Sequence, residues 1–216
     1  FPFSKSSSDL KDYPIVYKDI EVHIDDFKSL RGKSWLNDRI IHIYGRIIED
    51  GHEDIKFIPP CTVQYIRFKG GKEVTSVVSS WNLSNYSMVF IPFTNSESAR
   101  DPGNHWSLLV WFPKSGNRFY HCDSYQNISE LSHSSLKVAM SIVKKLICLC
   151  KLKKYKFIKA AVPQQDNNYD CGLYLLAYID FLVEKNTFEG MEEVITHEMI
   201  TSMRSSIERR ILNVRK

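Results

Sequence analysis

A β-hairpin near the middle of the chain constrains its fold more than any other stretch. Two apolar, aromatic-rich segments, "HWSLLVWF" (His105–Phe112) and "RFYHCD" (Arg118–Asp123), flank the five residues "PKSGN". Pro, Gly and Asn suit a turn, and the flanking segments have the composition of strands. If the turn is symmetric about Ser115, Ser107 pairs with Asp123. A sheet that contains this hairpin is therefore predicted.

Helical periodicity dominates the rest of the chain. Apolar residues at helical spacing predict one helix that Ser34 caps and Gly51 ends, and another over His133–Cys150. A buried helix is predicted over Cys171–Val183, and an amphipathic helix over Met191–Val214. Further expected elements are short helices after Pro59-Pro60 and over "KEVTSVVSS", and strands over "YSMVFIPF" and "KFIKAAV".

The chain is expected to fold as one domain. Its 216 residues, of which 43% are hydrophobic, suffice for one sizeable core, and no linker divides them. We predict an α+β domain over residues 10–216 with a central sheet. Residues 1–9, rich in Ser and Lys, are expected to form a flexible arm.

Composition argues against several kinds of protein. The net charge of +4 is mild and lacks the basic stripe of a nucleic-acid binder. The longest apolar runs fall short of the roughly 18 residues of a membrane-spanning helix. Five cysteines without a secretion signal favour reduced thiols and a cytoplasmic or nuclear protein. No motif indicates a metal or cofactor, so we expect neither, and we expect no nucleic-acid or membrane partner.

The hairpin also places an acid beside a histidine. In the predicted register His105 is a diagonal neighbour of Asp123 on the same face, about 7–8 Å apart at the backbone, which the two side chains can bridge. Such an acid fixes the tautomer of the histidine and stabilises its protonated form. A slip of one residue would turn Asp123 to the other face. His121 is interpreted as facing away from Asp123, so His105 is the better candidate base.

Cys171 is the candidate nucleophile. At a helix start its sulfur lies near the positive end of the helix dipole, which favours the thiolate. Gly172 is expected to leave the backbone approachable by a substrate carbonyl, and the Gln165 amide can donate to a developing oxyanion. The alternative is a buried structural cysteine, which most lone cysteines are. The His105–Asp123 pair favours the nucleophile.

Four motifs occur in the order seen in one protease family: "SWLND" (Ser34–Asp38), "HWSLLV" (His105–Val110), "FYHCDS" (Phe119–Ser124) and "PQQDNNYDCGLYLL" (Pro163–Leu176). The sequence resembles the ubiquitin-like-specific (Ulp or sentrin-specific) cysteine proteases from about Ile15 to the C-terminal helix. The resemblance implies a papain-like fold, with a central mixed sheet and flanking helices. It also implies cleavage after the C-terminal Gly-Gly of a ubiquitin-like modifier.

By the same resemblance, His105 is the general base, Asp123 its orienting acid, Cys171 the nucleophile and Gln165 part of the oxyanion hole.

The resemblance further implies a groove for the modifier tail. Trp106 corresponds to the tryptophan that covers a narrow tunnel, which only glycines can thread. Trp35 and Asp38 correspond to residues of the same groove. For both tryptophans the alternative is ordinary core packing.

The modifier itself is less constrained. The eleven-residue polar loop Thr94–Asn104 is similar to that of the Nedd-type deneddylases, while Cys122 and the "DNN" segment depart from the family pattern. We expect a monomeric deneddylase that binds a Nedd-like modifier and its conjugates. The alternatives are a SUMO-specific or multi-modifier (ubiquitin/SUMO) protease, acyl transfer in the other direction, and a catalytically silent module that only binds a ubiquitin-like protein.

Overall fold

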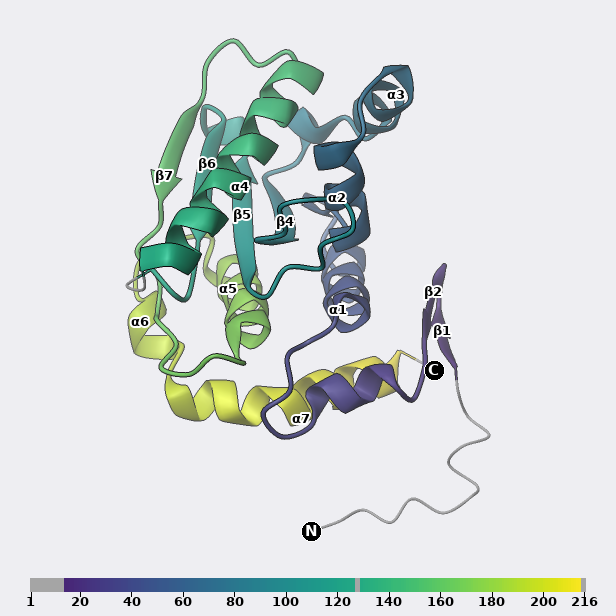
Figure 1. Cartoon of the computed structure of the whole chain (residues 1–216), viewed down its shortest axis with the longest axis vertical. Coiled ribbons are helices and arrows are strands. Elements are labelled where there is room, and N and C mark those ends of the chain that lie inside the picture. Colours follow the sequence, from purple (N-terminus) through teal and green to yellow (C-terminus); the bar gives the residue numbers. More distant parts are fainter. Residues whose placement is uncertain (1–13, 127–128, 215–216) are drawn as a thin grey trace.

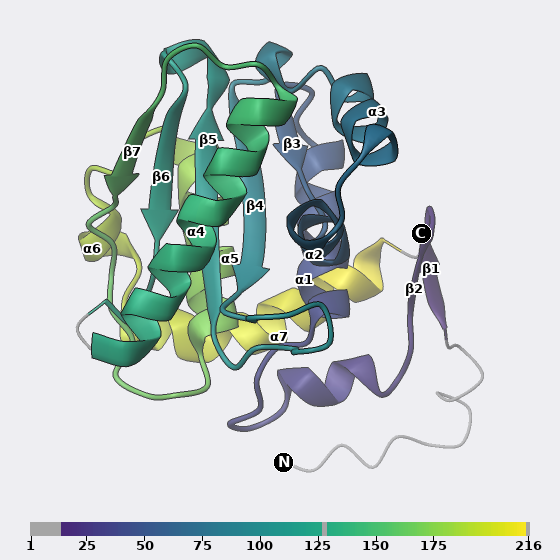
Figure 2. The same cartoon turned by 45° about the horizontal axis from the view of Figure 1, so that its top comes forward.

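A computed structural model describes residues 14–126 and 129–214, so the arm expected over residues 1–9 lies outside the described residues. At the centre is a five-stranded mixed sheet in the order β3–β4–β5–β6–β7. Figure 1 labels β4 to β7, and Figure 2 labels all five strands. Strands β4 (Met88–Thr94), β5 (Trp106–Phe112) and β6 (Arg118–Cys122) are antiparallel neighbours. The outer strands β3 (Ile55–Phe57) and β7 (Lys156–Lys159) run parallel to β4 and β6. The predicted α+β fold with a central mixed sheet is confirmed.

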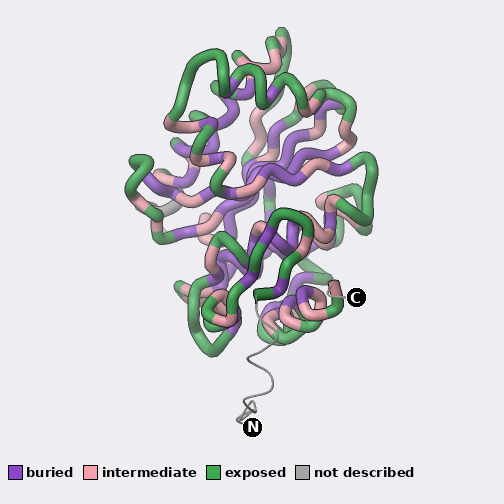
Figure 3. The backbone as a smooth tube through the Cα atoms, turned by 90° about the vertical axis from the view of Figure 1, so that its right-hand side faces the viewer, coloured by how far each residue is buried: buried purple, intermediate pink, exposed green. Residues whose placement is uncertain are grey.

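Helices cover both faces of this sheet (Figure 2). Because strand side chains alternate, each central strand contributes to two apolar cores. On one face the core includes α1 (Asp38–Asp50), α5 (Cys171–Lys185) and α7 (His197–Asn213). The other core lies beneath α2 (Pro60–Phe68), α3 (Lys72–Ser80) and α4 (Ser129–Leu149). Figure 3 shows buried backbone through the centre and exposed segments around the rim.

The predicted hairpin register is confirmed. Leu108 pairs with Cys122 and Phe112 with Arg118, as expected for a turn centred on Ser115. A short 3-10 turn over Pro113–Ser115 leads into Gly116 and Asn117, which have φ values of 76° and 55°. Glycine and asparagine tolerate this left-handed backbone better than other residues, which explains their place in the turn.

Two predicted helix boundaries are wrong. The first helix is capped by Asn37, whose Oδ1 accepts a hydrogen bond from the Ile40 N–H at 3.0 Å, and Ser34 lies before the helix. Residues 191–214 form two helices, α6 (Met191–Val194) and α7, because Thr196 starts a new helix by accepting from the Met199 N–H at 3.3 Å.

The sequence patterns also missed three short strands. Strand β3 and the hairpin of β1 (Ile15–Tyr17) and β2 (Ile20–Val22) have three residues each, too few for a periodic signal. Among the described residues, no helix has the length and apolar character to cross a membrane.

Candidate active site

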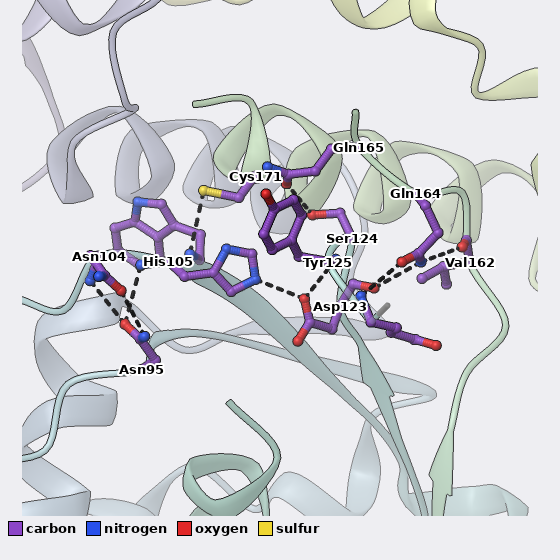
Figure 4. Close-up of polar contacts among 12 residues, drawn as sticks. Asn95, Asn104, His105, Asp123, Ser124, Tyr125, Val162, Gln164, Gln165 and Cys171 are labelled. Carbon is purple, nitrogen blue, oxygen red and sulfur yellow. Dashed lines mark hydrogen bonds and ion pairs between the residues drawn. The ribbon is translucent and has the colours of Figure 1, made fainter. Parts of the chain in front are cut away.

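His105 and Asp123 meet at one end of the sheet. His105 immediately precedes β5 and Asp123 immediately follows β6, so both backbones are anchored by strands. The Nε2 of His105 lies 2.7 Å from Oδ1 of Asp123, and both side chains are almost fully buried (Figure 4). This is the arrangement expected from the diagonal placement in the hairpin. The contact fixes the ring of His105 with its other nitrogen free for a second partner.

The loop after β6 holds the Asp123 carboxylate in place. Its Oδ1 also accepts from the Tyr125 N–H at 3.0 Å. The side chain of Gln164 donates to the Asp123 carbonyl at 3.0 Å and accepts from the Gln126 N–H at 2.8 Å. The acid is therefore positioned by bonds to its side chain and to its backbone.

The thiol of Cys171 completes the cluster. Cys171 is the first residue of α5 and is buried, and its Sγ lies 3.5 Å from the Trp106 N–H. Figure 4 shows the sulfur on the side of the His105 ring opposite Asp123. Burial lowers the pKa of His105, but hydrogen bonds and charges from Asp123 and Cys171 outweigh it and raise the pKa to about 9. At neutral pH the imidazole is therefore protonated and can stabilise a thiolate.

Gln165 lies beside Cys171 in Figure 4. Its Oε1 accepts from the Ser124 hydroxyl at 2.6 Å, and its Nε2 donates to the Asn167 carbonyl at 2.6 Å. Its backbone N–H donates to the Ser124 carbonyl at 2.8 Å. These bonds set which end of the amide is the donor and leave the second Nε2 hydrogen for another acceptor. The contact of Ser124 with Gln165 joins residues 41 positions apart, so no local sequence pattern predicts it.

Gly172 is required for packing, and the expectation of an open approach there is wrong. Gly172 is buried, and a Cβ on it would lie 2.9 Å from the Leu36 Cβ. The start of α5 therefore lies directly against the segment that leads into α1.

An apolar cavity of about 380 Å³ adjoins the thiol. Trp35, Asp38, Trp106, His105 and Cys171 are among the residues that line it. The structure thus brings the three residues expected to form the groove together with the thiol.

The two tryptophans differ in burial, and Trp106 packs against the core of α1, α5 and α7 while it also lines the cavity. Trp35 is 49% exposed and donates from Nε1 to the Asn168 carbonyl at 2.7 Å. Trp106 is partly buried and donates from Nε1 to the Leu36 carbonyl at 2.9 Å. Each indole is fixed by one hydrogen bond while an apolar ring surface faces the cavity.

Hydrogen bonds join the two ends of the polar loop between β4 and β5, where Asn95 meets Asn104 and His105; we call this its closed neck. Asn95 Oδ1 accepts from the backbone N–H groups of Asn104 and His105, at 2.9 and 3.2 Å. Its Nδ2 donates to the Asn104 side chain at 2.7 Å, and its own N–H donates to the His105 carbonyl at 3.2 Å. Asn95 thus fixes the backbone of His105. The sequence signal was present, since asparagines stand at both ends of the loop.

His121 faces the same side as Asp123, so the interpretation that it faces away is wrong. Side chains two residues apart in a strand share a face, and His121 stacks on Phe93, with ring centroids 5.8 Å apart. Burial lowers the pKa of His121 to about 4, and the charge of Asp123 only partly opposes this. His121 is therefore a neutral, buried imidazole, packed on Phe93 on the same face of the sheet as the His105–Asp123 pair.

Comparison with known proteins places this geometry in a family. Residues 34–214 match the family model of the Ulp1 protease family, C-terminal catalytic domain. The chain is 32% identical over 208 residues to probable sentrin-specific protease 8 of Dictyostelium discoideum, covering 85% of this chain and 82% of the relative. It is 30% identical over 181 residues to NEDD8-specific protease 1 of Arabidopsis thaliana, covering 82% and 77%.

A solved structure shares the fold. The Ulp1 protease domain in complex with Smt3, the yeast ortholog of SUMO, is similar with a TM-score of 0.72 at 20% identity, covering 93% of this chain and 87% of the other. The chain belongs to the Ulp1 family of cysteine proteases, which act on ubiquitin-like modifiers.

Proposed function

We propose that this protein is a deneddylase, a cysteine protease that cleaves after the C-terminal Gly-Gly of a NEDD8-like modifier. It would process the modifier precursor and release the modifier from conjugated lysines. The observation that carries the proposal is the assembly of His105, Asp123 and the Cys171 thiol at one end of the sheet, beside an apolar cavity.

The first half of the reaction follows from this geometry. The Cys171 thiolate attacks the carbonyl carbon of the terminal glycine, and the electrons of that carbonyl move onto its oxygen. The free Nε2 hydrogen of Gln165 is suited to donate to this oxyanion. As the tetrahedral intermediate collapses, the C–N bond breaks and the His105 imidazolium gives its proton to the leaving amine.

The second half releases the modifier. His105, now neutral, takes a proton from a water molecule, which attacks the thioester carbonyl. The C–S bond then breaks and the thiolate–imidazolium pair is restored. The modifier leaves as a carboxylic acid, which loses its proton to solvent and becomes a carboxylate. Asp123 holds the ring of His105 in one orientation through both steps.

The groove supports a narrow, small-residue tail. Trp35 and Trp106 line the cavity next to Cys171 with their rings fixed by hydrogen bonds. In the proposed complex these two rings contact the glycine tail as it approaches Cys171, where glycines let the backbone pass close to them. Asp38, at the start of α1 on the same cavity, is assigned to contacts with the tail.

The choice of a NEDD8-like modifier rests on two supports. The relatives at 30–32% identity are named as NEDD8-specific protease 1 and sentrin-specific protease 8. The second support is the resemblance given above, by which the polar loop between β4 and β5 is similar to that of the Nedd-type deneddylases. SUMO is the second candidate, because the structural relative is bound to Smt3.

The test is a panel of C-terminal fluorogenic and vinyl-sulfone derivatives of NEDD8, SUMO and ubiquitin. We expect the NEDD8 derivatives to be cleaved and captured fastest. Cys171→Ala should abolish cleavage and capture while retaining binding. Preference for SUMO would replace the proposed modifier, and full activity of Cys171→Ala would refute the mechanism.

The base assignment has its own matched pair of variants. His105→Ala should lose activity, whereas His121→Ala should keep much of it, because His121 is a neutral imidazole behind the pair. The reverse result would show that the wrong histidine of the hairpin has been assigned.

A further inference from the structure

Arg204, on α7, reaches the residue that precedes the nucleophile. Its Nη2 donates to Asp170 Oδ1 at 2.6 Å, and its Nη1 donates to the Ser29 carbonyl at 3.0 Å. The side chains of Arg204 and Asp170 are only 11% and 8% exposed. Removing one partner from such a pair leaves the other charge poorly solvated, so the contact constrains both residues.

Asp170 is in the N-cap position of α5, yet its side chain makes no capping hydrogen bond. An aspartate in that position ordinarily accepts from the second or third N–H of the helix. Here Oδ1 binds Arg204, and Oδ2 accepts from Asn167 Nδ2 at 2.9 Å. The carboxylate is therefore bound elsewhere and does not cap the N–H groups of Cys171 and Gly172, the first two of α5. The third, that of Leu173, donates to the Asp170 carbonyl at 2.9 Å.

Asn167 continues the chain of bonds to the oxyanion side. Its Oδ1 accepts from the Asp170 N–H at 3.0 Å, and its carbonyl accepts from Gln165 Nε2 at 2.6 Å. Gln165 is held in turn by Ser124. A continuous set of hydrogen bonds thus joins Arg204 of the C-terminal helix to the amide that is suited to bind the oxyanion.

We propose that Arg204 is a positioning residue for hydrolysis, which acts by holding the Asp170 carboxylate away from the start of α5. This keeps the N–H groups of Cys171 and Gly172 available to the oxyanion, keeps an uncompensated anion away from the Cys171 thiolate, and anchors the segment that carries Gln165. The proposal rests on the roles proposed above for Cys171 and Gln165.

The chain offers a matched control on the same two helices. Arg210 of α7 lies 3.5 Å from Asp180 of α5 and donates to the Tyr44 hydroxyl at 3.0 Å. This contact also joins α7 to α5, but more than two helical turns from Cys171. Arg204→Gln and Arg210→Gln therefore both loosen the helix pair, and only the first releases Asp170.

The kinetic test uses a fluorogenic modifier substrate. We expect R204Q to lower kcat about 10- to 100-fold with little change in KM, since it disturbs the reacting groups more than the groove. R204K should fall between, because it keeps the charge but not the two-pronged contact. The double variant D170N/R204Q should recover the part of the lost kcat that the released anion causes, although the anchor of the Gln165 segment stays lost. R210Q should stay within about threefold of the wild type.

A second measurement needs no modifier substrate. The rate of Cys171 alkylation by iodoacetamide, followed on its peptide by mass spectrometry, reports the thiolate fraction as pH is varied. R204Q should move the midpoint of this profile to higher pH, because the released carboxylate disfavours a neighbouring thiolate. D170N/R204Q should return the midpoint, and R210Q should leave it in place.

Three outcomes would overturn the proposal: equal losses of kcat in R204Q and R210Q, an unmoved alkylation midpoint in R204Q, or no recovery in the double variant. If R204Q does not fold, R204K and R210K are compared by the same two measurements. Activity that survives Cys171→Ala would instead refute the proposed function, and the alkylation profiles would still decide whether Arg204 acts on the thiol.

Discussion

The Nε2 of His105 and the Oδ1 of Asp123 lie 2.7 Å apart across the open end of a hairpin whose register its turn dictates. With its pKa raised to about 9, His105 is protonated at neutral pH and loses that proton only as the pH passes about 9. Because the imidazolium must supply the proton to the leaving amine, activity should fall on the alkaline side of that value.

Asp123→Asn should therefore change the shape of the pH profile as well as the rate. Removing the carboxylate removes a group that raises the pKa of His105, so the alkaline limb of kcat/KM should move to lower pH. We expect kcat to fall about 10²- to 10⁴-fold. The measurement is kcat/KM from pH 5 to about 10 with a fluorogenic substrate. An unshifted alkaline limb would contradict the assignment of Asp123.

Ser124→Ala should impair the oxyanion site without removing it. The Ser124 hydroxyl holds the Gln165 oxygen, and without it only the bond from Nε2 to the Asn167 carbonyl keeps the amide from turning its acceptor towards the oxyanion. We expect kcat to fall about 10-fold, compared with about 10²- to 10³-fold for Gln165→Ala. The double variant should be no slower than Gln165→Ala alone, because both changes act through one amide. Additive losses would show that Ser124 acts by another route.

Gly172→Ala should disturb the groove through Leu36. The new Cβ would lie 2.9 Å from the Leu36 Cβ, and the Leu36 carbonyl holds the Trp106 indole. Overpacking of this kind costs about 1–3 kcal/mol of unfolding free energy, and we expect KM to rise as Trp106 shifts. Gly70→Ala is the control, since a Cβ there meets nothing within 4 Å. Denaturant unfolding and steady-state kinetics of the two variants test this, and an unchanged KM in Gly172→Ala would argue against the coupling.

His121 should make the protein acid-sensitive. Burial lowers its folded-state pKa from 6.5 to about 4. Between these two pH values His121 is protonated in the unfolded chain but neutral in the folded chain. The stability from this group is fully present above about pH 6.5 and is lost as the pH falls towards about 4, by roughly 2–3 kcal/mol. His121→Phe should flatten that dependence. Urea unfolding of both proteins at pH 7 and at about pH 4.5 measures how much unfolding free energy each loses on acidification. An equal loss in the wild type and in His121→Phe would contradict this prediction.

The hairpin could be predicted from the sequence because the residues that determine its register lie next to one another in the chain. A five-residue turn with Gly and Asn determines which residues of the two strands face each other, and the positions of His105 and Asp123 follow from it. Cys171 could be placed at a helix start for a similar reason, since a long apolar run begins there. Both groups then needed the tertiary structure to bring them together.

What could not be predicted depends on contacts distant in the chain. The cap of α1 is Asn37 because that side chain also donates to Asp26, a contact that Ser34 does not make in this structure. Gly172 faces Leu36, and Arg204 binds Asp170, across separations that carry no periodic signal. The face of His121 is different, because strand alternation alone predicts that it shares a face with Asp123.

The closed neck of the loop between β4 and β5 has an evolutionary consequence. Asn95 and Asn104 bind each other, and Asn95 also holds the backbone of His105, while residues 97–100 beyond them are exposed. Substitutions, insertions or deletions in that exposed part need not move His105, because the hydrogen bonds of Asn95 fix its backbone independently of the rest of the loop. Descendants of such a protein can therefore vary the exposed part of the loop while His105 keeps its position.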